Sequence, residues 1–206
     1  MWAKRCMRPA DGRGDGAAAF SRIVRRAGIL PLVLGVAALA GCGRPAGPPA
    51  AAAPPRLDLV DHAELMARVA AHRGTVVVLD CWSTSCPPCV REFPGLVRLA
   101  AAHPDTVACL SLSFDYEGIG SPEDAADKVR GFLARVGAGR IENLLARVEA
   151  DAMYDALDLD SVPAVYVWRA DGSLARRFDD DDAKRRLGRP FTYEDVEAEV
   201  RACLAR

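Results

Sequence analysis

Apolar and polar residues alternate along the chain in three distinct ways. An apolar run near the N-terminus, at 29–40, is followed by a stretch without periodicity, and helix and strand patterns fill the rest. Runs rich in β-branched residues at 75–82 and 106–114 predict strands buried on both faces. Apolar residues at helical spacing and helix-start signals predict five helices: 61–72, 87–102, 122–136, 149–157 and 193–204.

The remaining pattern completes an α/β arrangement. Two short strands at 164–169 and 173–178 are joined through a turn that contains Asp171 and Gly172, which is a hairpin signal. The range 140–147 fits either a short strand or the start of a helix. Asp179–Asp182, followed by basic residues, is interpreted as a solvated loop, with a divalent-cation site as the alternative. The order βαβα, hairpin, α predicts a sandwich with a mixed central sheet.

The N-terminal segment is interpreted as an export signal with an anchor. Basic residues end at Arg26, and the apolar run that follows is too short to cross a bilayer, which takes about 20 residues. Leu39-Ala40-Gly41-Cys42 resembles the lipobox of bacterial lipoproteins, in which the cysteine is lipidated. An ordinary cleaved signal with a chance cysteine is the alternative. We therefore expect a lipoprotein signal peptide at 1–41 and membrane attachment through Cys42.

A Pro/Ala-rich stretch follows Cys42 and predicts a tether at 42–56 before a single folded domain at 57–206. The formal net charge of −1 is unevenly distributed. Residues 1–41 carry +5, and the remainder has 20 basic and 26 acidic side chains. A mildly acidic body lacks the clustered basic face that nucleic acid requires, so nucleic-acid binding is not expected.

Chemistry is concentrated at Cys86-Pro87-Pro88-Cys89, where a buried strand passes into a helix. The thiolate is the attacking species in disulfide exchange, and the N–H groups of a helix N-terminus stabilise it. The two-residue spacer places Cys89 one turn along the same helix. We expect Cys86 to attack first and Cys89 to resolve the mixed disulfide. Asp80 lies inside the apolar strand, where burial raises the pKa of a carboxyl group and makes it a candidate proton acceptor for Cys89.

The block from Asp80 to Cys89, with Pro94 eight residues after Cys86, resembles the active site of the thioredoxin superfamily. Its continuation through Glu92 looks like the form found in membrane-tethered thiol–disulfide oxidoreductases of the ResA/TlpA type. The resemblance implies a thioredoxin-like three-layer sandwich with a mixed central β-sheet flanked by helices. It also implies an active-site acid at Glu92 and a cis-proline at Pro163.

Together with the lipobox, this resemblance implies an extracytoplasmic enzyme of the bacterial cell envelope, lipid-anchored at Cys42. It would exchange electrons with protein thiol or disulfide substrates and would be supplied by a membrane electron donor. The sequence leaves the direction of electron flow open, and we take a reductant as the working hypothesis. We expect no cofactor and a monomer. The resemblance is specific over the active-site block and loose over 115–160.

Other functions remain open from the sequence. The cysteine pair could be half of a zinc site or a structural disulfide, although a closed zinc site needs four ligands. On the same fold, a peroxiredoxin-like peroxidase and a Sco-like copper-delivery protein are the alternatives. Cys81 and Cys109 lie in apolar strands and are expected to be inert core residues, whereas Cys203 could be either.

Overall fold

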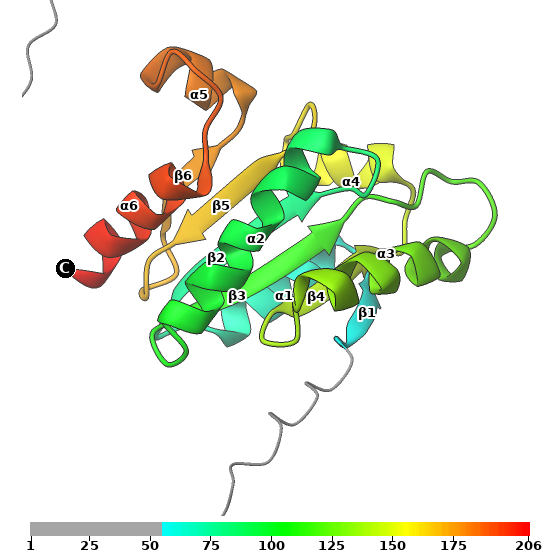
Figure 1. Cartoon of the computed structure of the whole chain (residues 1–206), viewed down its shortest axis with the longest axis horizontal. Coiled ribbons are helices and arrows are strands. Elements are labelled where there is room, and N and C mark those ends of the chain that lie inside the picture. The colour runs from blue at the N-terminus through cyan, green and yellow to red at the C-terminus, as the bar shows by residue number, and fades with distance from the viewer. Residues whose placement is uncertain (1–54) are drawn as a thin grey trace, which may run out of the picture. The chain divides into compact units, whose positions relative to one another are not determined.

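The structure, a computed structural model, describes residues 55–206 and contains one mixed α/β domain (Figure 1). The helices and strands of this part follow one another along the chain as β1 (Leu57–Val60), α1 (His62–Ala71), β2 (Val76–Trp82), α2 (Pro87–Ala102), β3 (Val107–Ser113), α3 (Pro122–Val136), β4 (Glu142–Ala146), α4 (Ala150–Leu157), β5 (Ala164–Trp168), β6 (Leu174–Phe178), α5 (Asp180–Arg186) and α6 (Tyr193–Leu204). No helix among residues 55–206 is both long and apolar enough to cross a membrane.

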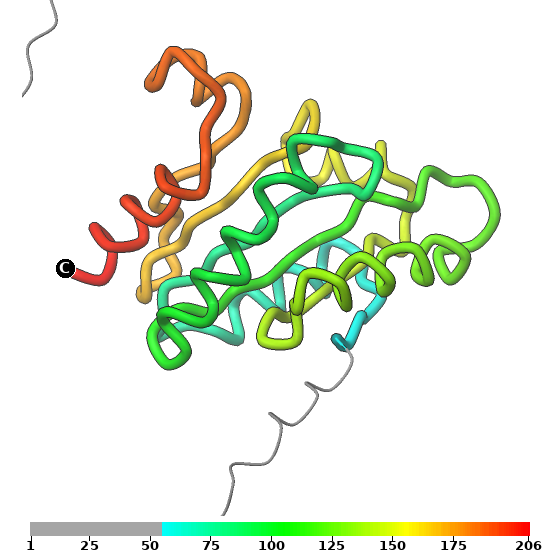
Figure 2. Tube along the Cα trace, in the orientation of Figure 1, coloured from blue at the N-terminus to red at the C-terminus, as the bar shows by residue number. Residues whose placement is uncertain are grey.

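The six strands form one sheet in the order β1-β4-β3-β2-β5-β6. The strands from β1 to β2 in this order are parallel, whereas β5 and β6 run antiparallel to their neighbours. All seven residues of β2 are buried, as its β-branched run predicts. Because β2 and β3 are parallel, their carboxyl ends meet at one edge of the sheet, and the chain enters α2 and α3 from that edge (Figure 2).

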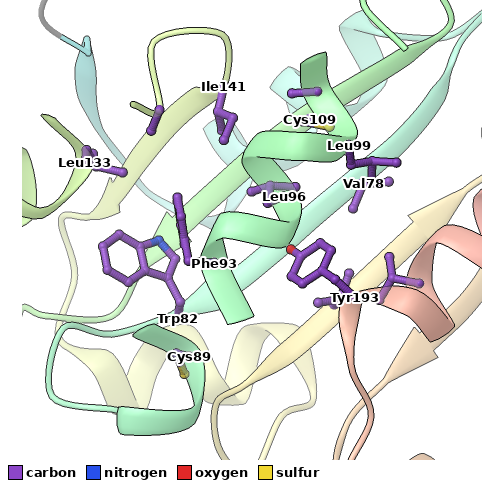
Figure 3. Packing of buried hydrophobic residues seen from close by; sticks show 14 of the residues in the cluster. Val78, Trp82, Cys89, Phe93, Leu96, Leu99, Cys109, Leu133, Ile141 and Tyr193 are labelled. Carbon is purple, nitrogen blue, oxygen red and sulfur yellow. The ribbon is translucent and has the colours of Figure 1, made fainter. Parts of the chain in front are cut away.

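Helices cover both faces of the sheet, which confirms the predicted three-layer sandwich. Alternate residues of a strand point to opposite faces. Val78 and Trp82 of β2 therefore pack in the cluster with α2, α3 and α6, whereas Leu79 and Cys81 pack in the cluster with α1 and α4. Figure 3 shows the first cluster, with the Trp82 and Phe93 rings beside each other. The active-site strand thus sits at the centre of both cores.

Most predicted elements form within one or two residues of their expected bounds. The helix predicted at 87–102 has those bounds and runs on through Pro94. Capping boxes at Asp61 and Ser121 satisfy the first N–H groups of α1 and α3. In α3 the acid of the capping box is Asp124, in the first turn of the helix. The ambiguous range at 140–147 is a strand, β4, because it pairs with β3 on one side and β1 on the other.

One sequence interpretation is wrong. The stretch from Asp179 to Asp182 is not a loop: Asp179 caps α5 by accepting a hydrogen bond from the Asp182 N–H at 2.7 Å. The Asp182 carboxylate is buried and lies 2.7 Å from Arg176 and 2.9 Å from Arg186. Acids in the first turn and bases in the last turn both favour this helix through its dipole.

Candidate active site

The turn between β2 and α2 holds the cysteine pair at the carboxyl edge of the sheet. Cys86 has extended backbone angles and is the N-cap of α2, followed by prolines whose missing N–H groups cost nothing in a first turn. Cys86 and Cys89 form a disulfide with a Cα–Cα distance of 5.3 Å. The sequence therefore placed both sulfurs correctly at the start of the helix.

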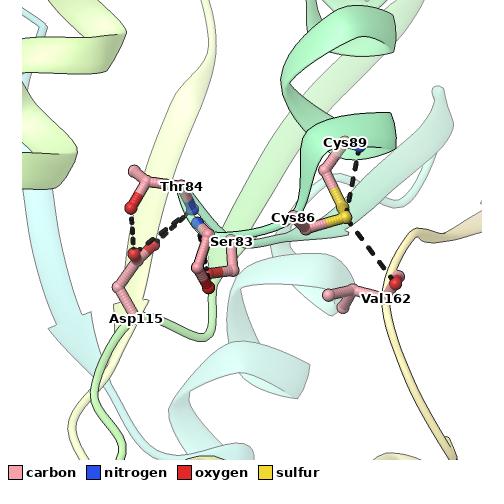
Figure 4. Close-up of a disulfide and its surroundings, with 7 residues drawn as sticks. Ser83, Thr84, Cys86, Cys89, Asp115 and Val162 are labelled. Carbon is pink, nitrogen blue, oxygen red and sulfur yellow. Dashed lines mark hydrogen bonds between the residues drawn. A yellow bond between two sulfur atoms is a disulfide. The ribbon is translucent and has the colours of Figure 1, made fainter.

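The two sulfurs differ in access. Cys86 is partly exposed, whereas Cys89 is 3% exposed and belongs to the core under α2. The Cys86 sulfur accepts a hydrogen bond from the Cys89 N–H at 3.2 Å (Figure 4). In the reduced protein the same N–H would favour a thiolate at Cys86, since a hydrogen bond to the charged form stabilises that form. This geometry fits Cys86 as the sulfur that meets a substrate.

A proline loop lies opposite the exposed sulfur. The Val162–Pro163 peptide bond is cis, as the resemblance implies, and leads directly into β5. The Val162 carbonyl oxygen is 3.7 Å from the Cys86 sulfur, as Figure 4 shows. The loop therefore places a backbone carbonyl next to the more exposed sulfur of the disulfide.

Asp80 lies in the middle of β2 on the face covered by α2 and α6, and it is 4% exposed. Loss of solvation raises the pKa of its carboxyl group and the nearby Glu92 adds to this effect, so that the pKa of Asp80 is about 7 in all. A hydrogen bond from the Tyr193 hydroxyl to Asp80 Oδ2, at 2.5 Å, acts in the opposite direction. Asp80 is thus not a surface residue at the strand end, and it can exchange a proton near neutral pH.

Glu92 and Tyr193 connect α2 to α6 beside this buried acid. Glu92 is partly exposed, and its Oε2 accepts a hydrogen bond from the Tyr193 N–H, the first residue of α6, at 3.3 Å. Sequence reasoning gave Tyr193 no role beyond starting the last helix. A tyrosine on the buried side of an amphipathic helix was the available signal, because a buried phenol needs a hydrogen-bond partner.

Asp115, which sequence reasoning also missed, holds the turn before Cys86. Its side chain is 3% exposed and accepts hydrogen bonds from the Thr84 N–H at 3.0 Å and the Ser113 hydroxyl at 2.7 Å. It also accepts from the Thr84 hydroxyl, as Figure 4 shows. The Lys128 ammonium lies 3.6 Å from Asp115 Oδ1. These contacts fix the backbone two residues before the exposed sulfur.

A cavity of about 370 Å³ opens beside Cys86 and Val162. The charged side chains that line it are carboxylates of Glu117, Glu149 and Asp151. The Cys86 sulfur therefore faces an acidic surface on this side.

The remaining cysteines of the described region lie away from the disulfide. Cys81 and Cys109 are buried, and burial raises the pKa of Cys109 to about 12 and that of Cys81 well above its ordinary value. Burial also raises the pKa of the partly buried Cys203. No group of three or more His, Cys, Asp or Glu residues within 55–206 is arranged to hold a metal ion. Cys42 and the predicted signal and tether lie outside the described residues, apart from the last two tether positions.

Comparisons with known proteins agree with this geometry at the level of the fold. A thioredoxin-like superfamily protein, SPOA0173, superposes with a TM-score of 0.51 at 20% identity, over 67% of this chain and 85% of that chain. The fold is thioredoxin-like. An uncharacterized conserved protein from Geobacillus kaustophilus gives a TM-score of 0.50 at 24% identity, over 65% of this chain and 69% of that one.

A third similar structure is a secreted Mycobacterium tuberculosis disulfide oxidoreductase homologous to E. coli DsbE. It gives a TM-score of 0.48 at 21% identity, over 65% of this chain and 85% of that one. No protein-family model matches the chain, and no curated protein matches it. The superposition on the thioredoxin-like protein SPOA0173 shows the fold, and the low identities leave the activity to be argued from the site.

Proposed function

We propose that the protein is an extracytoplasmic thiol–disulfide oxidoreductase that reduces protein disulfides through Cys86 and Cys89. One observation carries the proposal: a disulfide closes the first turn of α2 with one sulfur partly exposed and the other buried. A structural disulfide gains most by linking distant parts of a chain, and a bridge across three residues constrains little. A disulfide of this kind is better suited to reversible reduction and oxidation than to stabilising the fold.

The reaction begins with the reduced pair. The Cys86 thiolate attacks one sulfur of a substrate disulfide, the substrate S–S bond breaks, and the released thiolate takes a proton from solvent. Cys89 then gives its proton to the Asp80 carboxylate and attacks the Cys86 sulfur. The mixed disulfide breaks, and the second substrate sulfur leaves as a thiolate that takes a proton from solvent, while Asp80 returns the proton of Cys89 to solvent. The substrate has gained two electrons and two protons, and the protein holds the observed disulfide.

The loop at Pro163 completes the site in this proposal. The Val162 carbonyl, 3.7 Å from the Cys86 sulfur, is available to align an extended substrate segment beside the attacking atom. Main-chain hydrogen bonds of this kind tolerate many side chains, which suits an enzyme that acts on protein substrates.

The direction of electron flow is proposed from charge. Negative side chains near a thiolate raise its free energy and so favour transfer of its electrons to a substrate. Asp80 lies on the strand that leads to the pair, Glu92 lies three residues after Cys89 on α2, and the cavity beside Cys86 is lined by three carboxylates. These surroundings support a reductant rather than an oxidant.

The cellular setting belongs to the same proposal. The basic and apolar pattern of 1–41 supports export, and Cys42 supports a lipid anchor followed by a tether. An enzyme in that place would act on the envelope side, as a monomer, and would recover its two electrons from a donor in the membrane.

The test is a redox titration of the purified chain against defined thiol–disulfide buffers, read by alkylation and mass. We expect a potential near about −250 mV or lower, since thioredoxin lies near −270 mV. Cys86→Ser and Cys89→Ser should each abolish turnover of a protein disulfide, and Cys203→Ser should not. Turnover retained in both active-site variants would exclude the proposal, and a potential near about −120 mV would reverse its direction.

A further inference from the structure

A glycine lies in the middle of α2 where the helix itself does not need one. Gly95 sits inside the sixteen residues of α2, and glycine in a helix interior costs about 1 kcal/mol relative to alanine. A Cβ built on Gly95 would lie 2.2 Å from Cγ and 2.3 Å from Cβ of Tyr193. These atoms lie near the backbone of α6 and cannot swing aside. Gly95 therefore provides the space that admits the Tyr193 ring against α2.

The position of the ring determines where its hydroxyl goes. Figure 3 shows the Tyr193 hydroxyl pointing from α6 toward α2. It donates a hydrogen bond to Asp80 Oδ2 at 2.5 Å, and this is the one side-chain hydrogen bond that Asp80 receives from residues 55–206. Burial and the neighbouring Asp80 raise the pKa of the Tyr193 phenol well above its ordinary value, so the group remains a donor.

We propose that Tyr193, seated against Gly95, is a positioning residue of the thiol–disulfide site that orients the Asp80 carboxyl group and favours its ionised form. This inference rests on the proposed function, because its purpose is to keep Asp80 able to take the proton of Cys89. The Tyr193 N–H, bound to Glu92, fixes the start of α6 and so fixes the ring.

The other titratable groups around Asp80 do not replace this contact. Glu92 on α2 acts on Asp80 as a like charge, which opposes ionisation. Cys109 on β3 and Cys81 on β2 have thiols with raised pKa values and stay neutral near pH 7. Among these neighbours, the Tyr193 hydroxyl is the group whose effect on Asp80 favours the carboxylate.

The experiment compares Tyr193→Phe with the parent protein by two readouts. The first is titration of the Asp80 carboxyl carbon by NMR in the oxidised protein, assigned with Asp80→Asn. The second is the pH dependence of exchange with a protein disulfide. We expect both to shift upward by about one pH unit, a tenfold change in the ionisation equilibrium. In an Asp80→Asn background, Tyr193→Phe should leave the pH profile of exchange unchanged.

A second variant and a matched control separate positioning from folding. Gly95→Ala keeps the Tyr193 hydroxyl but displaces the ring, so it should shift the titration of the Asp80 carboxyl group in the same direction as Tyr193→Phe does. Tyr166→Phe removes another buried phenol, which donates to the Leu157 carbonyl at 2.8 Å on the opposite face of the sheet. It should lower stability without moving either titration.

The outcomes distinguish this inference from the function on which it rests. If Tyr193→Phe leaves the carboxyl titration in place, or moves it without moving the exchange profile, the positioning role is wrong, even though exchange through Cys86 continues. If the parent protein shows no exchange at all, the proposed function fails first. The carboxyl titration then still reports whether Tyr193 controls Asp80.

Discussion

Replacing Asp80 with Asn should stabilise the oxidised protein at alkaline pH, and its effect on stability should become more favourable as pH rises. Burial raises the pKa of Asp80 from its ordinary value near 3.8 to about 7, so the folded state binds the proton more tightly than the unfolded state does. The stability that this proton contributes is complete below about pH 4 and is lost as pH rises through 7. Above pH 7 the folded protein carries a buried charge that Asn does not have.

The expected size follows from the shift of about three pKa units. At 1.36 kcal/mol per unit, the raised pKa of Asp80 lowers the free energy of unfolding, relative to acidic pH, by about 4 kcal/mol at pH 9 and by about 2 kcal/mol at pH 5. Asn retains an oxygen for the Tyr193 hydroxyl but adds an amide that needs an acceptor, at a cost of about 1–3 kcal/mol. That cost does not depend on pH, so the difference between the two pH values isolates the charge.

The assay is denaturant unfolding of the oxidised parent and Asp80→Asn proteins at pH 5 and pH 9, with matched m-values. The change in unfolding free energy on substitution should be more favourable at pH 9 by about 2–3 kcal/mol. Asp105→Asn, the same chemical change at an exposed site, should alter stability little at either pH. Equal effects of Asp80→Asn at both pH values would refute the assignment of a raised pKa to this carboxyl group.

Two further predictions concern the supports of the site. Gly131→Ala in α3, where a new Cβ meets only the end of Arg135 at 3.9 Å, should raise the unfolding free energy by about 1 kcal/mol. Gly95→Ala should lower it, because its Cβ would collide with Tyr193. Calorimetry that finds both variants stabilised would contradict the close packing of Tyr193 against Gly95. Asp115→Ala should lower the unfolding free energy by about 1–3 kcal/mol for each buried donor left unpaired, and it should slow exchange with a protein disulfide. Asp127→Ala, which removes an exposed ion pair on α3, should change neither quantity.

Local sequence signals predicted the elements that carry the chemistry. The β-branched run of β2 and the prolines at the first turn of α2 act within a few residues, so the pattern alone placed Cys86 at the helix start. Strand β1 was missed because its four residues are stabilised by pairing with β4, more than 80 residues away. Pairing across such a distance leaves no periodic signal in a stretch this short.

Helix α5 was a different kind of error, because its signals were present. Asp179 is a good N-cap, and acids then bases in successive turns match the helix dipole. The composition was interpreted as solvated charge, yet Asp182 is buried against Arg176. A charged run can thus be structural when its members pair with one another across a turn and with a neighbouring strand.

The contact between Tyr193 and Asp80 joins residues 113 positions apart, and the sequence around either residue does not predict it. Asp80 could be recognised as a buried acid from its strand, but a buried carboxyl group could be solvated by water, by a lysine or by a hydroxyl from any element. The informative residue was Gly95. A glycine that a helix tolerates at a cost, with no turn or cap to explain it, indicates that another element approaches its backbone closely. Helix α6 packs against α2 through Tyr193, and the buried hydroxyl of that side chain then needs a hydrogen-bond acceptor in the core. Given those two constraints, the acid on the adjacent strand was the group that could provide one.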